Sequence, residues 1–325
     1  MKRLLGGISL VLIIVATANL IPAGRAQETD APAQQPNNNG AAANPLKVAL
    51  LKWYAGNRTT SFAVGNAPRS VVFDGANVWV TNESDDTVSK LRANDGFNLG
   101  TFSVGRTPYG MAFDGASLWV SNSNANSVTK LRASDGKNLG TFAVGQQPWG
   151  VAFDGSDIWV ANSMQSTVSK LRTSDGKTLG TFSVYGPRGL AFDGTYMWAS
   201  SVNDAVTRLK LDGKNAGTFK VGAQPNGMAF DGANIWVANS NTGNVTKLRA
   251  SDGKNLGTFA VNGDPYAVLF DGTHIWVSVG GLDVLRISDG NIVYRFNLDV
   301  SGAGMAFDGA NVWVAGYGGK SIFKL

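Results

Sequence analysis

The side chains best suited to ligand binding recur at one position of a repeated stretch, directly after a proline in six of its seven copies. The position holds Arg69, Tyr109, Trp149, Arg188, Asn226, Tyr266 and Ala303. Aromatic rings stack on flat or cyclic ligands, and guanidinium groups pair with anions. We predict that the first six of these residues form a ligand-binding site. The alternative is that they are ordinary loop residues that shield the entrance of a channel.

Residues that could catalyse a reaction are sparse. The single histidine, His274, stands in a predicted turn, and the only glutamates are Glu28 and Glu83. A glycosidase would need two carboxyl groups that face each other across a cleft, and nothing in the sequence pairs Asp264 with Asp299. We predict no catalytic residue, no cofactor and no metal ligand.

Two sets of acidic residues have side chains that could bind a cation. Glu83, Asp85 and Asp86 share one variable loop, but their spacing matches no calcium-binding loop. An aspartate also follows the phenylalanine of every Phe-Asp-Gly step, and a ring of such aspartates could hold a cation. We expect these aspartates to cap their own turns instead, because Asp side chains bond to the backbone two residues further on.

A repeat must bring the candidate residues together. The Phe-Asp-Gly steps begin at Phe73, Phe113, Phe153, Phe192, Phe230, Phe270 and Phe307, with spacings of 40, 40, 39, 38, 40 and 37 residues. A tryptophan follows each phenylalanine by six positions. A period near 40 built from short strands is typical of a β-propeller with one blade per repeat. We predict an all-β, seven-bladed β-propeller of four-stranded antiparallel blades, in which the tryptophans fill the gaps between blades.

One repeat, residues 107–145, shows how a blade would place the candidate residues. Strand patterns at 110–113 and 118–121 flank one Asp-Gly turn, and those at 127–132 and 139–144 flank another. Both turns project from the same end of the ring. The opposite end carries the variable loops, where binding residues usually lie. Because the first strand of a blade is innermost, the seven positions should surround the mouth of the central channel at that end.

A basic pair recurs in the third strand, as in Lys130 and Arg132. We expect these pairs to form a solvated, ion-paired girdle near the outer side of the blades. The alternative is a rim that binds a polyanion, and such binding would depend steeply on salt.

The ends of the chain predict export and ring closure. Residues 1–26 have the basic start, apolar core and small-x-small site of a secretory signal peptide, with an uncleaved membrane anchor as the alternative. Residues 27–46 are predicted to be a disordered Ala/Gln/Asn/Pro-rich tether, and residues 47–325 a single propeller. The chain ends in a third-strand pattern, so we predict that residues 59–64 supply the fourth strand of the last blade and remove its exposed edge.

Charge and cysteine content limit the partners. Without the three basic residues of segment 1–26, 25 basic residues face 23 acidic ones, a net charge near +2 that argues against nucleic acid as the partner. The sequence has no cysteine, so ring closure must depend on hydrogen bonds and packing. We expect a monomer with no transmembrane segment after removal of the signal.

The repeats resemble a known family. Residues 79–82 (Trp-Val-Thr-Asn) with 86–91, and residues 144–155, are similar to the Tyr-Val-Thr-Asn (YVTN) β-propeller repeat family, and the resemblance covers residues 59–325. It implies an exported bacterial or archaeal propeller and little about chemistry. Streptogramin lyases have related seven-bladed propellers, but their His-x-Glu catalytic signature is missing, because His274 is followed by Ile275 and Trp276.

These features favour an exported, non-catalytic binding or interaction propeller, periplasmic or extracellular. Its partner at the channel mouth would be a small molecule, a glycan, or a peptide or protein. One alternative is a lyase or hydrolase of the streptogramin lyase-like type that uses aspartates at the mouth, with or without a metal ion. Another is a cell-surface structural protein that the tether displays.

Overall fold

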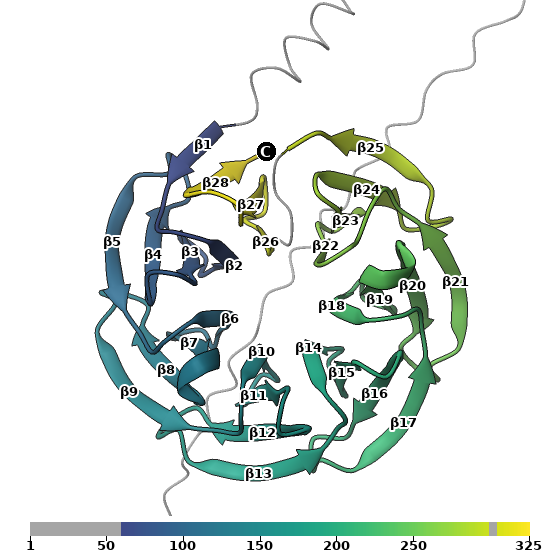
Figure 1. Cartoon of the computed structure of the whole chain (residues 1–325), viewed down its shortest axis with the longest axis horizontal. Helices are drawn as coiled ribbons and strands as arrows, with labels where there is room; N and C mark the ends of the chain where they lie inside the picture. Colours follow the sequence, from purple (N-terminus) through teal and green to yellow (C-terminus); the bar gives the residue numbers. More distant parts are fainter. Residues whose placement is uncertain (1–59, 299–303) are drawn as a thin grey trace, which may run out of the picture. The chain divides into compact units, whose positions relative to one another are not determined.

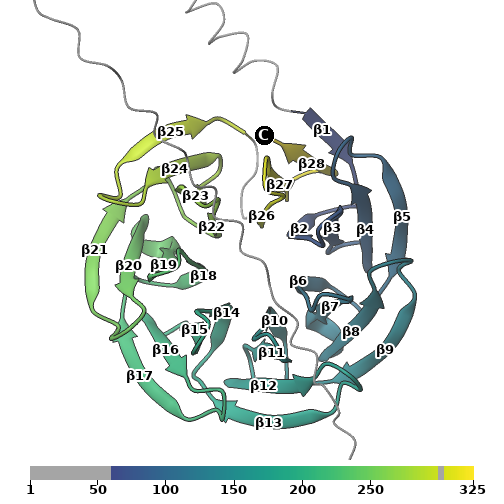
Figure 2. The same ribbon diagram turned by 180° about the vertical axis from the view of Figure 1, so that it is seen from behind.

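Seven antiparallel sheets of four strands each form a ring (Figure 1, Figure 2). The computed structural model describes residues 60–298 and 304–325. The predicted signal peptide, the predicted tether, Asp299 and Ala303 lie outside the described residues. The seven-bladed, all-β prediction is confirmed.

The strands follow the chain from the innermost to the outermost position of each blade. Blade 1 contains β2 (Pro68–Phe73), β3 (Asn77–Asn82), β4 (Thr87–Arg92) and β5 (Asn98–Ser103). Blade 2 contains β6 (Pro108–Phe113), β7 (Ser117–Asn122), β8 (Ser127–Arg132) and β9 (Asn138–Ala143). Blade 3 contains β10 (Pro148–Phe153), β11 (Asp157–Asn162), β12 (Thr167–Arg172) and β13 (Thr178–Ser183). Blade 4 contains β14 (Pro187–Phe192), β15 (Met197–Ser201), β16 (Ala205–Leu209) and β17 (Asn215–Lys220).

The remaining blades keep the same order. Blade 5 contains β18 (Pro225–Phe230), β19 (Asn234–Asn239), β20 (Asn244–Arg249) and β21 (Asn255–Ala260). Blade 6 contains β22 (Val268–Phe270), β23 (His274–Ser278), β24 (Leu282–Arg286) and β25 (Ile292–Phe296). Blade 7 contains β26 (Met305–Phe307), β27 (Val312–Gly316), β28 (Ser321–Lys324) and, from the other end of the described chain, β1 (Thr60–Ala63). Short 3-10 turns follow β7 (η1, Ser123–Ala125) and β19 (η2, Ser240–Thr242).

Ring closure follows the sequence prediction. β1 pairs antiparallel with β28, with Thr60 opposite Lys324, so the strand from residues 60–63 completes the last blade. The Phe62 ring packs 5.5 Å from the Trp313 ring across this pair of strands. The ring also closes at its inter-blade seam, because Nζ of Lys324 donates to the carbonyl of Ala93 in blade 1 at 2.8 Å.

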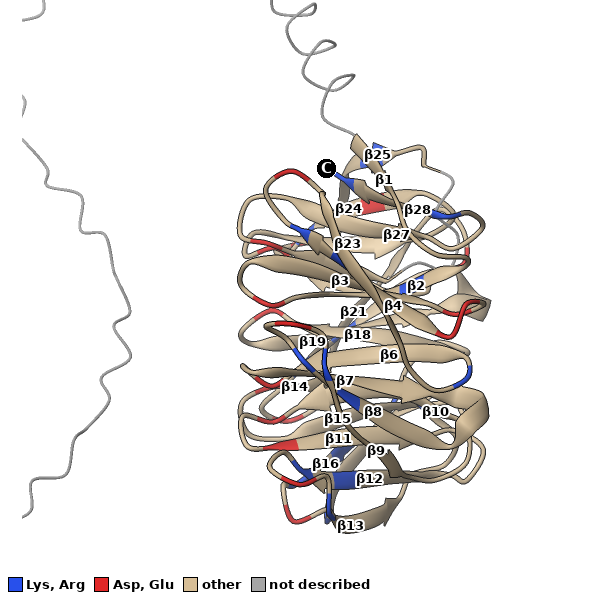
Figure 3. Ribbon diagram, turned by 90° about the vertical axis from the view of Figure 1, so that its left-hand side faces the viewer, with Lys and Arg blue, Asp and Glu red and all other residues tan. Residues whose placement is uncertain are grey.

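Each Phe-Asp-Gly aspartate caps its own turn, as predicted. In blade 1, Oδ1 of Asp74 accepts hydrogen bonds from the backbone N–H groups of Ala76 and Asn77, at 2.9 and 2.7 Å. Its Oδ2 accepts the indole N–H of Trp79 at 2.7 Å. Burial would raise the pKa of Asp74, but these hydrogen bonds outweigh it and hold the pKa below its usual value. Edge-on, many acidic residues lie in the turns along one face of the ring (Figure 3).

The tryptophans form the seams between blades, as predicted. Trp276 is partly buried. The other six have 0% exposure: Trp79, Trp119, Trp159, Trp198, Trp236 and Trp313. In blade 1 the Trp79 ring lies 5.7 Å from Phe102 on the outermost strand. Aromatic residues thus fill the wedge-shaped space that widens away from the axis.

The prediction of a solvated girdle is wrong for the first basic residue of each pair and right for the second. Blade 4 reverses the residue types, and there Arg208 is buried while Lys210 is exposed. Lys90 is 6% exposed and sits opposite Trp79, with Nζ 5.0 Å from the ring centroid. Nζ donates to the carbonyl of Ala133 in the next blade at 2.7 Å. Arg92, two residues on, pairs instead with Asp95 at 2.8 Å, and both side chains are about half exposed. Strand register, which places the first residue of the pair in the seam and the second at the strand end, decides the difference.

Candidate functional site

The predicted site residues come together at the centre of the ring. A cavity of about 190 Å³ is lined by Arg69, Tyr109, Trp149, Arg188, Asn226 and Tyr266, with apolar side chains that include Met111, Val151, Leu190, Met228 and Val268. Five of the six rim residues occupy the second position of an innermost strand, and Tyr266 lies two residues before β22. The predicted placement around the channel mouth is confirmed for these six.

A tight backbone frame fixes the rim. A Cβ atom on Gly110 would lie 2.2 Å from the carbonyl oxygen of Trp149 in the next blade, so only glycine permits this approach. The hydroxyl of Ser121 accepts the Gly110 N–H at 2.8 Å and donates to the Trp149 carbonyl at 2.6 Å. Neighbouring innermost strands are therefore locked together directly beneath the rim side chains.

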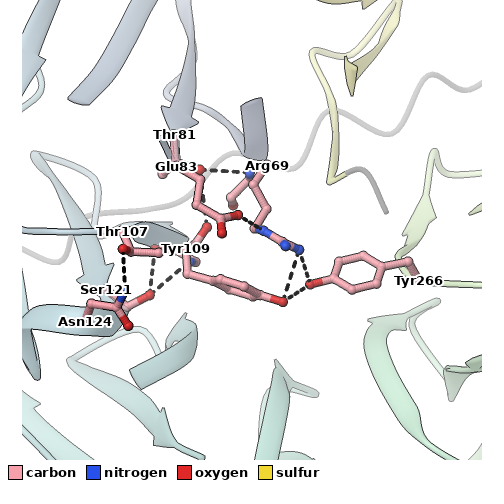
Figure 4. Close-up of polar contacts among 10 residues, drawn as sticks. Arg69, Thr81, Glu83, Thr107, Tyr109, Ser121, Asn124 and Tyr266 are labelled. Carbon is pink, nitrogen blue, oxygen red and sulfur yellow. Dashed lines mark hydrogen bonds and ion pairs between the residues drawn. The ribbon is translucent and has the colours of Figure 1, made fainter. Parts of the chain in front are cut away.

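One side of the mouth is closed by an arginine and two tyrosines (Figure 4). Nη1 of Arg69 in blade 1 donates to the hydroxyl of Tyr109 in blade 2 at 3.1 Å and to that of Tyr266 in blade 6 at 2.7 Å. The two hydroxyls also contact each other, and Nε of Arg69 pairs with Glu83. Arg69 is thus already neutralised by a carboxylate, which the sequence interpretation did not foresee. We name these four residues the Arg69 bridge.

The ionisation of the bridge follows from its burial. Burial raises the pKa of Tyr109 and of Tyr266 above the ordinary tyrosine value. Burial disfavours the charged form of Arg69 and by itself would lower the arginine pKa. The interactions with the two tyrosines and Glu83 outweigh burial, so the pKa of Arg69 lies above its ordinary value. At neutral pH the tyrosines are therefore uncharged and the arginine is charged. Such groups hold a structure together but offer no proton exchange near pH 7.

The other side of the mouth is organised around Arg188. The Trp149 ring stacks on Tyr109 with centroids 4.7 Å apart and an interplanar angle of 16°, and the Arg188 guanidinium lies 5.1 Å from the Trp149 centroid. Nη1 of Arg188 donates to Oδ1 of Asn226 at 2.8 Å and approaches Oε1 of Gln224 at 3.5 Å. Asn226, 7% exposed, donates in turn to the hydroxyl of Ser240 at 3.0 Å.

Arg188 has no ionic partner within residues 60–298 and 304–325. No carboxylate oxygen in that part of the chain lies within 4.0 Å of its guanidinium, and its buried Nε makes no hydrogen bond there. Gln224 and Ser240, which hold the arginine and its partner Asn226, were missed by the sequence interpretation. Their position in the variable rim loops was the available signal.

A second hollow opens beside Arg188. Its volume is about 540 Å³, and it shares Trp149, Arg188, Asn226 and Tyr266 with the central cavity. The rest of its lining includes Gln224, Ser240, Asp264 and Val279. The mouth therefore has two unlike sides, the Arg69 bridge and a hollow lined in part by Arg188. We call the second feature the Arg188 hollow.

The acidic groups considered as cation ligands have structural partners. Glu83 pairs with Arg69, Asp85 accepts the backbone N–H of Asn66 at 2.7 Å, and Asp86 accepts that of Thr107 at 2.7 Å. Among the described residues, no three His, Asp or Glu side chains gather closely enough to hold a metal ion.

The remaining candidate, His274, begins β23 beside the capped turn of Asp271, away from the mouth. Its Nδ1 lies 2.9 Å from the hydroxyl of Thr273.

Within residues 60–298 and 304–325, no helix is long and apolar enough to cross a membrane.

Comparison with solved structures identifies the fold. The chain is similar to hydrazine synthase of Kuenenia stuttgartiensis at 20% identity and a TM-score of 0.70, covering 80% of this chain and 95% of that one. It is similar to virginiamycin B lyase from Staphylococcus aureus at 19% identity and a TM-score of 0.70, covering 82% and 98%. A streptogramin B lyase structure gives 19% identity, a TM-score of 0.70, and coverage of 82% and 96%.

The similarity to these structures shows a shared propeller architecture and nothing about chemistry. No protein-family model matches the sequence, and a search of curated proteins gives no match. The resemblance to streptogramin lyases is therefore confirmed at the level of fold, and membership of the YVTN family stays a prediction.

Proposed function

We propose that this protein is a non-catalytic binding propeller whose ligand occupies the Arg188 hollow at the channel mouth. The observation that carries the proposal is a positioned arginine without a counter-ion in the described chain, at the point where two cavities meet. Pockets at the mouth of a rigid ring are common ligand sites, and a few convergent polar groups usually provide their specificity.

The six rim residues divide into two roles under this proposal. Arg188, Asn226 and the accessible parts of Trp149 contact the ligand, because they line the Arg188 hollow. Arg69 and Tyr109 act as positioning residues, because their polar groups are consumed within the Arg69 bridge. Tyr266 belongs to both sides, since it lines the hollow and accepts from Arg69.

A ligand screen with matched variants tests the proposal. Purified protein would be screened by thermal shift against metabolite, glycan and peptide libraries, with and without divalent cations. Hits should lose affinity in Arg188→Gln and Asn226→Ala. They should be retained in Arg106→Gln, which removes an exposed arginine from the same end of the ring that does not line either cavity. Hits that bind all variants equally would contradict a site at the mouth.

A lyase or hydrolase is the second candidate, and one observation favours it. Asp264, an exposed carboxylate, lines the same hollow as Arg188, so an acid or base and an anion-binding group share one pocket. Conversion of a library compound by wild-type protein, lost in Asp264→Asn, would replace the binding proposal with an enzymatic one.

We also propose that the protein is exported, on the basis of the signal-like pattern at residues 1–26. The mass of the protein recovered outside the cytoplasm should correspond to a chain that begins near residue 27. An exported form that retains Met1 would contradict cleavage.

A further inference from the structure

The geometry points to a small organic monocarboxylate as the ligand class of the Arg188 hollow, an inference that rests on the binding role proposed above. A guanidinium stays charged at neutral pH, and its free N–H groups form charge-assisted hydrogen bonds with a carboxylate. The recognition element would be the Arg188 guanidinium, with the organic body of the ligand lying in the hollow beside it.

The first step of the argument is that Arg188 is held in place by neutral groups. Asn226 and Gln224 accept from Nη1, and the guanidinium lies against Trp149. Each contact orients the side chain, but none neutralises its charge. Nη2 makes no hydrogen bond among the described residues and, unlike Nε, is not buried, so it remains open to a ligand. A preorganised cation of this kind binds an anion with little loss of side-chain freedom.

The second step is a comparison of the two rim arginines. Arg69 occupies the equivalent position in blade 1, but its charge is met by Glu83 and its Nη1 by two tyrosine hydroxyls. The blades thus provide an internal reference in which the same residue type at the same position has its anion built in. Neutral acceptors orient Arg188 as the tyrosine hydroxyls orient Arg69, but within the described chain no carboxylate pairs with Arg188.

The third step decides between classes of anion. Asp264 lines the same hollow, so the net charge of the lining side chains is near zero rather than strongly positive. Asp264 would repel a phosphate or another dianion more strongly than a carboxylate, whose single charge Arg188 alone can balance. Trp149 and Val279 also line the hollow and provide apolar surface for an organic body. A volume of about 540 Å³ accommodates a ligand with one aromatic ring.

The test compares acids with their neutral isosteres. Isothermal titration of the purified protein would use benzoate and indole-3-acetate, their amides benzamide and indole-3-acetamide, and inorganic sulfate and phosphate. We expect at least one carboxylate to bind and its amide to bind at least tenfold more weakly, because a charge-assisted hydrogen bond is lost. Sulfate and phosphate should bind more weakly than that carboxylate.

Variants locate the effect. Arg188→Gln should weaken carboxylate binding by roughly tenfold or more. Arg188→Lys should restore only part of it, because lysine lacks the planar group that lies against Trp149 and bonds to Asn226. Arg106→Gln, with the same change of charge at an exposed position outside the hollow, should bind as wild type does. Circular dichroism of each variant checks that the fold is retained.

The outcomes separate this inference from the binding role. If neutral compounds bind in the hollow as tightly as their acids, or if phosphate binds best, the monocarboxylate inference is wrong and the binding role stands. If the carboxylates fail to bind while other library compounds bind through Asn226, the inference also fails alone. If neither the carboxylates nor any library compound binds at the mouth, both are overturned.

Discussion

Nη1 of Arg69 donates to the hydroxyl of Tyr266 at 2.7 Å. The two residues are 197 positions apart in sequence, and their hydrogen bond joins blades 1 and 6 across the channel mouth. Blade 7, which lies between them in the ring, is completed by β1 from the start of the described chain. The hydrogen bond therefore spans the place where the ring closes. This side of the mouth contributes to closure, and the Arg188 hollow lies beside it.

Removal of the Tyr266 hydroxyl should weaken this closure. Tyr266→Phe keeps the aromatic side chain but removes the hydroxyl, which accepts from Arg69 and contacts the hydroxyl of Tyr109. We expect the free energy of unfolding to fall by about 1–2 kcal/mol, because buried polar groups lose a partner. Urea titration measures the change. Tyr294→Phe, at a 64% exposed tyrosine on β25, is the control and should have little effect. Equal effects of the two substitutions would contradict a structural role for the bridge.

The seam lysines should contribute more to stability than the arginines two residues on. Lys90→Met removes a charged donor that bonds to the Ala133 and Ser134 carbonyls of the next blade, at 2.7 and 3.1 Å. We expect a loss of about 1–3 kcal/mol in the free energy of unfolding. Arg92→Met, which breaks an exposed pair with Asp95, should leave it nearly unchanged. The same chemical denaturation series measures both, and a larger loss in Arg92→Met would refute the assignment.

The sequence predicted the architecture because the period repeats seven times and each copy carries the same turn and tryptophan. It also predicted closure by residues 59–64, because the last repeat visibly lacks its fourth strand. The burial of Lys90 could not be predicted, since both faces of a propeller strand are covered and alternation no longer marks the solvent side. Only the register opposite Trp79 reveals it.

The candidate site was predicted in position but not in function. All six rim residues gather at the mouth, because the starts of the innermost strands converge on the axis. The sequence could not distinguish Arg69 from Arg188, since both follow a proline at the same point of the repeat. The difference arises from Glu83, which reaches Arg69 from a separate loop.

A glycine and an asparagine form a coupled pair in several blades. The N–H of Gly105 donates to Oδ1 of Asn122 at 3.0 Å, and a Cβ atom at Gly105 would lie 2.5 Å from Cγ of Asn122. Where the glycine is replaced, by Tyr185, Asn262 and Asp299, the asparagine is also replaced, by Ser201, Val279 and Gly316.

The pair should therefore show measurable coupling. We expect Gly105→Ala to cost about 1–3 kcal/mol through overpacking against Asn122. The double variant with Asn122→Ser should lose about 1 kcal/mol less than the two single losses combined, because the smaller side chain relieves the clash. A double-mutant cycle in urea measures the coupling. Strict additivity would show that the two residues vary independently.

The closing strand should be anchored mainly by its phenylalanine. Phe62→Ala removes the ring that packs 5.5 Å from Trp313, and we expect a loss of about 3 kcal/mol, as for other large-to-small core changes. Phe97→Ala, at a 61% exposed phenylalanine, is the matched control. Thermal unfolding measures both. A fully cooperative transition at the wild-type temperature in Phe62→Ala would contradict closure through β1.

The capped aspartates should make the fold sensitive to acid. The pKa values of Asp74, Asp154, Asp231, Asp271 and Asp308 are lowered, because hydrogen bonds from the turn backbone and the indole N–H outweigh the effect of burial. The unfolded chain, with ordinary aspartate pKa values near 3.9, then binds protons at a higher pH than the folded chain does. The stabilisation is therefore present above about pH 4 and is lost as the pH falls through the folded pKa values.

This acid sensitivity can be assigned to a single turn with Asp154→Asn. The variant keeps the shape of the buried side chain but cannot carry the charge that accepts the Trp159 indole N–H at 2.7 Å and pairs with Lys170 at 3.3 Å. We expect it to be less stable than wild type at pH 7. The difference should shrink as the pH falls below about 4, because the unfolded wild-type chain then binds protons at this aspartate before the folded chain does. Urea midpoints at each pH measure the difference. Asp175→Asn, at an aspartate paired with Arg172 on the surface, is the control and should stay close to wild type throughout. A difference for Asp154→Asn that stays constant from pH 7 to pH 2.5 would show that its cost comes from shape rather than from charge.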